Sequence, residues 1–322
     1  MEKRILGKTG IEVAPICFGG NVLGWTADEP TSFKILDAFV ATGFNFIDTA
    51  DIYSFWAPGN SGGESERVLG NWMKVRGNRP DLIIATKVGG QGTGPDNRGL
   101  DPAHILRTVE ESLKRLQTDY IDLYQSHLDD AQTPMEDTLG AYSKLVDQGK
   151  VRFIGASNYT VPRMKQALRI SDEQGYPQYH TLQPMYNLYD RNVFENELEP
   201  FCLENKIAVM SYFGLCSGFL TGKYRSKTDL GKSQRGDRIA RCLNQRGFRI
   251  LDALDTVSNE YASTPAVISL AWLLARPSVT TPIASASSPE QWMELAKAAG
   301  LRLRPETIEY LNKASVETEV YS

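Results

Sequence analysis

Short apolar runs, rich in β-branched and aromatic residues, alternate along the chain with longer amphipathic stretches. Eight of these runs have the length and composition of strands. In chain order they read APICFGG, FNFID, LIIATK, YIDLYQSH, VRFIGASN, HTLQPMYN, IAVMSY and TTPIASA, beginning near residues 14, 44, 82, 120, 151, 180, 207 and 280. Because strands that are buried on both faces read as continuous apolar runs, this pattern predicts a parallel sheet covered by helices.

The stretches between the runs carry helix signals. In LDPAHILRTVEESLKRLQ, Asp101 predicts an N-cap and Pro102 the first helical residue. Its apolar positions recur at helical spacing: Ile105, Val109, Leu113 and Leu116. TPMEDTLGAYSKLVDQGK predicts a second helix, capped by Thr133 and ended by Gly149.

Eight strand–helix units fit either a closed (β/α)₈ barrel or an open doubly wound sheet. An open nucleotide-binding sheet would place GxGxxG directly after its first strand, and no such motif stands there. GGQGTG (89–94) has the wrong glycine spacing and precedes a Pro-Asp-Asn loop, so it predicts a flexible loop. We therefore expect one (β/α)₈ (TIM) barrel domain over residues 1–322. An N-terminal hairpin, turned at Thr9-Gly10, is expected to close its bottom.

Composition narrows the class of protein. The 322 residues are 41% hydrophobic and 10% aromatic, enough for a sizeable core, and the formal net charge is −4. No block of five like charges indicates a nucleic-acid or membrane-surface partner. No signal-like start and no run of ~18 apolar residues is present, and the four cysteines lie far apart. These features predict a soluble cytoplasmic protein with reduced thiols.

Most of the predicted strands end on polar residues, which are unusual neighbours for buried apolar runs. The endings are Asp48, Lys87, His127, Ser157-Asn158, Gln183, Ser211-Tyr212 and Ser285. Taken singly, each has an ordinary structural explanation, such as a turn, a snorkelling lysine or a core histidine. In a barrel, however, they converge on the C-terminal mouth, where the active sites of this fold lie. Together they predict a functional site.

Tyr53 follows Asp48 by five residues and supplies a phenol to the same mouth. A Lys87 ammonium ~4 Å from that phenol contributes about 4 kcal/mol at an effective dielectric of ~20, which is roughly three pK units. The expected pKa of Tyr53 is then near 7. Asp48 would hold the ammonium in place, and a neutral His127 would donate a hydrogen bond to a substrate oxygen. This arrangement is suited to protonating a developing alkoxide.

The four residues lack an electron source. No HxH pair is present, so a metal-dependent barrel hydrolase is disfavoured and no metal is expected. A hydride donor is needed, which indicates a nicotinamide cofactor. Ser157, Asn158 and Gln183 would hold its carboxamide and Tyr212 would stack on its ring. A helix N-cap is the alternative role for Ser157-Asn158.

The chain resembles the aldo-keto reductases over nearly its whole length. The resemblance rests on GFNFIDTADIY (43–53), IIATK (83–87), SLKRLQTDYIDLYQSH (112–127), VRFIGASNY (151–159), QPMYNLYDR (183–191) and GFLTGKY (218–224). It implies a barrel, NAD(P)H-dependent carbonyl reduction and a catalytic tetrad of Asp48, Tyr53, Lys87 and His127. The motif at 183–191 is more similar to the bacterial oxidoreductase and potassium-channel β-subunit branches. The short tail implies that a long C-terminal loop is absent.

The resemblance also implies further cofactor contacts and shows departures. ICFGGN and PIASASSPEQWMEL differ from the usual family text, with Ser288 where a basic residue is common. A helix N-terminus at Pro289 would bind phosphate, with Ser287 and Ser288 adding hydroxyls or capping the helix. NADP(H) is favoured over NAD(H) by the resemblance. The expected contacts beyond the nicotinamide ring are Gly20, Asn21, Phe213, Leu215, Ser217, Gly218, Lys223, Arg225, Ser285, Ser287, Ser288 and Gln291. For Lys223 and Arg225, a solvated loop face is the alternative.

Aromatic loop residues are candidates for a substrate pocket: Trp25, Phe55, Trp56 and Tyr159. Ordinary loop packing is the alternative for each. A flat apolar pocket would suit aromatic aldehydes, quinones or sugar rings. Two hypotheses follow. The first is an enzyme that reduces aldehydes or ketones to alcohols by direct hydride transfer, with a tyrosine acid. The second is a cofactor-binding regulatory subunit with slow turnover. The oligomeric state and the substrate are not indicated.

Overall fold

The computed structural model describes residues 1–90, 99–232 and 236–317. Its centre is a parallel sheet in the order β10, β3, β4, β5, β6, β7, β8, β9. Each strand overlaps one of the eight predicted runs. They are β3 (Cys17–Gly19), β4 (Phe46–Asp48), β5 (Ile83–Val88), β6 (Ile121–Ser126), β7 (Val151–Ser157), β8 (Tyr179–Gln183), β9 (Ala208–Val209) and β10 (Ile283–Ala284).

The two edge strands of this sheet are joined by backbone hydrogen bonds. Thr280 N donates to Val209 O (2.9 Å), and Ile283 N donates to Ser211 O (2.8 Å). The sheet is thereby closed, which confirms the predicted (β/α)₈ barrel. Residues 91–94 of the glycine-rich GGQGTG run lie outside the described residues.

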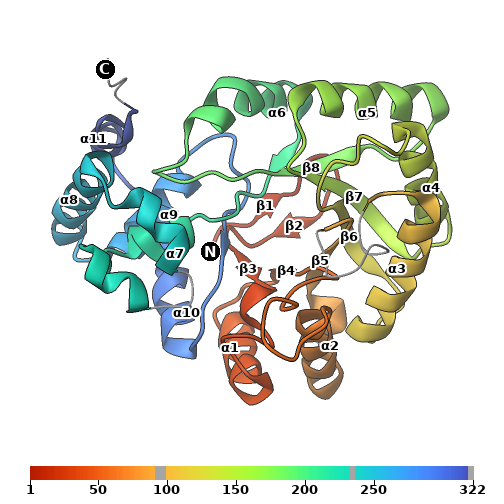
Figure 1. The fold of residues 1–322 in the computed structure, drawn as a ribbon, viewed down its shortest axis with the longest axis horizontal. Coiled ribbons are helices and arrows are strands. Elements are labelled where there is room, and N and C mark those ends of the chain that lie inside the picture. Colours follow the sequence, from red (N-terminus) through yellow and green to blue (C-terminus); the bar gives the residue numbers. More distant parts are fainter. Residues whose placement is uncertain (91–98, 233–235, 318–322) are drawn as a thin grey trace.

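Helices surround the barrel strands (Figure 1). Those along the chain are α1 (Glu29–Ala41), α2 (Glu64–Arg76), α3 (Pro102–Leu116), α4 (Met135–Asp147), α5 (Val161–Gln174), α6 (Glu199–Asn205), α7 (Gly236–Ile239), α8 (Gln245–Glu260), α9 (Pro265–Leu274), α10 (Pro289–Ala296) and α11 (Pro305–Ser315). The largest apolar cluster fills the layer between strands and helices. The strands are thus buried on both faces, as their continuous apolar runs predict.

The two helices with the clearest sequence signals begin differently. In α3 the Asp101 carboxylate accepts hydrogen bonds from the backbone N–H groups of Ala103 and His104, so the predicted cap is confirmed. In α4 the predicted Thr133 cap is wrong. The Thr133 hydroxyl donates to Asp130 instead (2.7 Å), and α4 begins after Pro134 without a side-chain cap.

The N-terminal hairpin pairs β1 (Arg4–Ile5) with β2 (Glu12–Val13) in antiparallel register, as predicted. Its turn includes Gly10, whose φ of 74° suits glycine. Leu6, Ile11 and Val13 pack in one cluster with side chains of the barrel interior, among them those of β3, β4, β5 and β6. The hairpin therefore closes one end of the barrel with apolar side chains.

Candidate active site

A buried lysine links the two residues that the sequence pattern placed around it. Asp48 ends β4, and Lys87 lies near the end of the neighbouring β5. The Lys87 Nζ contacts Asp48 Oδ2 at 2.5 Å, Thr49 O at 2.9 Å and Tyr53 Oη at 3.0 Å. Each of the three ammonium protons therefore has an acceptor. Burial lowers the pKa of Lys87, but the charges of Asp48 and Tyr53 outweigh it and the net pKa is raised.

The second oxygen of Asp48 is held by two amides. Gln125 and Gln183 each donate from Nε2 to Asp48 Oδ1 at 3.0 Å. Sequence reasoning missed Gln125 because it lies inside an apolar run. Period-two alternation offers a signal, since Gln125 is two residues before His127 and faces the same side of the sheet. The Nε2 of Gln183, expected near the nicotinamide, also donates to Gln125 Oε1 at 3.2 Å.

His127 lies beside the phenol, with ring centroids of His127 and Tyr53 6.0 Å apart. Burial, followed by the charge of Lys87, lowers the pKa of His127 to about 3, so the ring is neutral at neutral pH. Its Nδ1 is buried without a hydrogen-bond partner among the described residues. A proton there would lack an acceptor, which assigns the proton to Nε2.

The expected pKa near 7 for Tyr53 is wrong. Burial raises the pKa of Tyr53 above 10.0, and the lowering by Lys87 is smaller than the effect of burial. Asp48 raises it further. The estimate from sequence counted the lysine charge without the loss of hydration, which penalises the phenolate. Tyr53 therefore carries its proton at neutral pH.

Trp56 packs against Tyr53, and two further aromatic rings pack against Trp56. Trp56 contacts Tyr53, Phe55 and Trp25, with ring centroids 5.9, 5.4 and 5.5 Å apart. Trp56 is 37% exposed to solvent. These rings form an aromatic wall, defined here as Trp25, Phe55 and Trp56, against the phenol.

Tyr159, the fourth expected pocket residue, is placed elsewhere. It is buried, and its hydroxyl lies 3.5 Å from that of Tyr179, with ring centroids 5.6 Å apart. Tyr179 in turn contacts the Ser126 hydroxyl at 2.8 Å. Tyr159 therefore belongs to a hydrogen-bonded cluster in the core.

The residues expected around the nicotinamide bond to one another. The Ser157 hydroxyl donates to Gln183 O at 2.9 Å, and Asn158 Nδ2 donates to His127 O at 3.0 Å. The Tyr212 hydroxyl donates to Asn158 Oδ1 at 2.8 Å. Asn158 adopts a φ of 60°, a conformation that asparagine tolerates. These four residues are brought to the same strand ends as the tetrad.

The segment after β9 contains consecutive residues in the left-handed region. Phe213 has a φ of 55°, and Cys216, Ser217 and Gly218 have φ values of 47°, 57° and 100°. The last three begin the 3₁₀ segment η5 (Cys216–Thr221), directly after the half-buried Leu215. Sharp turns of this kind can direct successive backbone N–H groups toward an anion.

Two cations expected near phosphate groups lie further along. Lys223 is exposed, and its Nζ is 5.2 Å from the centroid of the Tyr224 ring. Arg225 pairs with Asp255 at 2.7 Å and also donates to Gly222 O. Arg225 is therefore already occupied by a carboxylate.

The other expected cofactor contacts gather at β3, β10 and α10. Ser288 caps α10 by accepting from Gln291 N (3.3 Å), while Ser287 donates from its N and Oγ to Gln291 Oε1 (2.9 Å each). Capping is thus the role observed for Ser288. The Ser285 hydroxyl donates to Asn21 Oδ1 at 2.6 Å.

The space around Gly20 is too small for a side chain. A Cβ there would lie 3.0 Å from the Ser65 hydroxyl and 3.1 Å from Asp48 O. The backbone of Gly20 therefore passes close to the end of β4.

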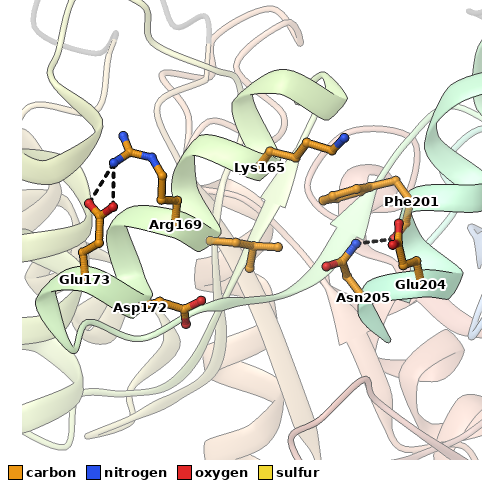
Figure 2. Close-up of a pocket in the computed structure, with 8 residues that line it drawn as sticks. Lys165, Arg169, Asp172, Glu173, Phe201, Glu204 and Asn205 are labelled. Carbon is orange, nitrogen blue, oxygen red and sulfur yellow. Dashed lines mark hydrogen bonds and ion pairs between the residues drawn. The ribbon is translucent and has the colours of Figure 1, made fainter.

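A surface groove of about 420 Å³ lies between α5 and α6 (Figure 2). Its wall includes the Arg169–Glu173 ion pair, and Asn205 donates to the backbone oxygen of Phe201. The groove is on the outer helices, away from the strand ends that carry the tetrad.

No helix in the described part of the chain is long and apolar enough to span a membrane. Nor do its acidic, histidine and cysteine side chains form a cluster that could hold a metal.

The barrel mouth thus holds a lysine that bridges a carboxylate and a tyrosine, next to a neutral histidine. The chain belongs to the Aldo/keto reductase family, whose profile matches residues 15–316. It is therefore an NAD(P)H-dependent oxidoreductase.

Similar proteins come from bacteria, plants and yeast. The "Uncharacterized oxidoreductase YrpG" of Bacillus subtilis is 34% identical over 97% of this chain and 95% of its own length. A "Probable voltage-gated potassium channel subunit beta" of Arabidopsis thaliana is 30% identical over 92% and 91%. The "Aldo-keto reductase yakc [NADP(+)]" of Schizosaccharomyces pombe is 28% identical over 94% and 88%.

Asp51, on the turn between Asp48 and Tyr53, predicts a pH dependence of stability. Burial, then the charge of Glu66, raises the pKa of Asp51 to about 8, although Arg115 and Lys87 act in the opposite direction. Its Oδ1 is buried without a partner in the described structure. Since an unfolded aspartate titrates near ~3.9, the folded protein binds the extra proton and loses stability as pH rises from about 4 to about 8.

We therefore expect Asp51→Asn to remove this loss. Between pH 5 and pH 8 the unfolding free energy of the wild type should fall by at least ~1 kcal/mol more than that of the variant. Urea unfolding at both pH values measures it. Asp252→Asn, on the exposed face of α8, is the control and should follow the wild type. Parallel curves for Asp51→Asn and the wild type would contradict the assignment.

Proposed function

We propose that this protein reduces the carbonyl group of small, flat aldehydes or ketones to an alcohol, with NADPH as preferred donor and Tyr53 as the general acid. One observation carries the proposal. The Lys87 ammonium donates to both Asp48 Oδ2 and Tyr53 Oη. We also propose that residues 1–322 act as one domain.

The hydrogen bond from Lys87 sets the direction of the phenolic proton. Because Tyr53 Oη accepts from Nζ at 3.0 Å, its own O–H is free to donate to a substrate oxygen. An alkoxide is about as basic as hydroxide, whose conjugate acid has a pKa of ~15.7. A developing alkoxide is therefore a strong acceptor for the proton of Tyr53. Lys87 then stabilises the phenolate that remains.

His127 and the aromatic wall orient the substrate in this proposal. The Nε2–H of the neutral imidazole supplies a second donor for the substrate oxygen. Trp25, Phe55 and Trp56 offer apolar faces to the rest of the molecule, which favours aromatic or other flat carbonyl compounds.

The donor set fits a nicotinamide dinucleotide. Ser157, Asn158 and Gln183 offer amide and hydroxyl groups for a carboxamide. We place the phosphates against the left-handed turn at Cys216–Gly218 and the start of α10. The bound group would supply the hydride. The name of the yeast relative, which includes NADP(+), supports NADPH over NADH.

The test is to follow NADPH and NADH oxidation with a panel of aromatic, aliphatic and sugar aldehydes and quinones. We expect turnover with NADPH and aromatic or quinone carbonyls, at a kcat of about 1 s⁻¹ or more. Tight NADPH binding without turnover on any member would favour the alternative, a slow regulatory subunit. The names of several relatives, among them the plant one, support that alternative.

A further inference from the structure

Two of the four free cysteines meet at the segment expected to bind the cofactor phosphates. Cys216 begins η5, and Cys242 ends η7 (Ala240–Cys242). Their Sγ atoms are 3.5 Å apart, and both side chains are buried. The other two cysteines, Cys17 and Cys202, lie in the barrel interior and on α6.

Two charged side chains contact this thiol pair at Cys216. Arg241 Nη2 lies 3.8 Å from Cys216 Sγ, as does Asp190 Oδ2. The hydrogen bond from Cys216, aided by the charge of Arg241, lowers the pKa of Cys242 against the effect of burial. The same hydrogen bond and burial raise the pKa of Cys216. The thiolate is the reactive form of cysteine, and the hydrogen bond between the two sulfurs stabilises a thiolate on either of them.

Solvent is close to the pair despite its burial. The Arg241 side chain that contacts Cys216 is 49% exposed, and it is held over the sulfurs by its ion pair with Asp190 at 2.7 Å. A half-exposed side chain therefore lies directly against one of the two sulfurs.

The geometry points to Cys216 and Cys242 as a reversible oxidation site that controls cofactor affinity. With hydrogen peroxide as the oxidant, the thiolate of one cysteine attacks one oxygen, the O–O bond breaks, and hydroxide leaves to become water. The sulfur of the other cysteine then attacks the resulting sulfenic acid, a second water leaves, and the disulfide forms. Two thiols thus lose two electrons and two protons to one peroxide. A dithiol reverses the change by exchange.

The new bond would reshape the cofactor segment. A disulfide requires about 2.05 Å between the sulfurs, so they must approach by more than an ångström. Cys216 adjoins Ser217 and Gly218, and all three hold left-handed φ values. Their backbone is held in one conformation by its surroundings, and small displacements of a positioned binding group cost affinity. The effect on affinity rests on the proposed cofactor role of this segment; the formation of the bond does not.

The test begins on the full-length protein, reduced or treated with peroxide. After denaturation, titratable thiols should fall from the four free cysteines to two, and peptide mapping should join Cys216 to Cys242. The oxidised protein should melt about 5 °C higher, since the bond closes a loop. Its dissociation constant for NADPH, from protein fluorescence, should rise about tenfold and recover with dithiothreitol.

Variants separate the formation of the disulfide from its effect on NADPH affinity. Cys216→Ser and Cys242→Ser should each lose every response, and Cys202→Ser, outside the pair, should keep them all. Four remaining thiols in the wild type, or a bond to Cys17 or Cys202, would overturn the oxidation site whether or not a serine variant folds. A mapped disulfide with unchanged NADPH affinity would overturn its control of binding. Reduced protein that does not bind NADPH would instead refute the proposed function.

Discussion

Replacing Tyr53 with phenylalanine is expected to lower kcat by about 10²- to 10⁴-fold while the dissociation constant for NADPH changes less than about twofold. The substitution removes one hydroxyl and leaves the ring packed against Trp56 and His127. Among the described residues, Tyr53 is the one hydroxyl that Lys87 contacts directly, so without it the developing alkoxide must take its proton from a poorer source. Steady-state kinetics and fluorescence titration measure the two effects separately.

A matched control removes a buried hydroxyl elsewhere. Tyr142→Phe deletes the hydroxyl that lies 2.9 Å from the Ser126 hydroxyl in the core. It should cost about 1 kcal/mol of stability and leave kcat near that of the wild type. If Tyr53→Phe kept its turnover while Tyr142→Phe lost it, the acid would have to be another residue.

Of the single substitutions proposed for this protein, Lys87→Met is expected to lower the free energy of unfolding most. The lysine and Asp48 are both essentially inaccessible to solvent, and the variant leaves a buried carboxylate without its cation. Breaking such a pair on one side costs about 3–5 kcal/mol. Turnover should fall at least about a hundredfold, because no positive charge then stabilises the phenolate. Urea unfolding and NADPH oxidation measure these losses.

Two further variants show whether the unpaired charge causes the loss of stability in Lys87→Met. The double variant Lys87→Met/Asp48→Asn removes both charges and should regain most of the lost stability without regaining turnover. Lys150→Met breaks a surface pair with Glu110 (2.5 Å) and should cost no more than about 1 kcal/mol. A double variant as unstable as Lys87→Met would mean that packing, not charge, dominates.

The barrel could be predicted because its strands are buried on both faces. Each of the eight runs is continuous, and period and length distinguish it from the helices between. Helix starts were less predictable. Asp101 caps α3 as the sequence indicates. The Thr133 hydroxyl instead donates to the Asp130 carboxylate, a contact that depends on how the preceding loop folds.

Parts of the site depended on tertiary structure in the same way. The position of Lys87 between Asp48 and Tyr53 follows from adjacent strand ends, which a sequence pattern reveals. The raised pKa of Tyr53 does not, because burial is a property of the assembled loops. Gln125 was missed for a different reason: it lies inside the strand, before the polar ending at His127 on which the sequence analysis relied.

The N-terminal hairpin has a consequence for how molecules reach the tetrad. Its Leu6, Ile11 and Val13 fill one end of the barrel interior with apolar side chains. In the proposed function, substrate and cofactor are therefore expected to approach from the opposite end, where the strands finish.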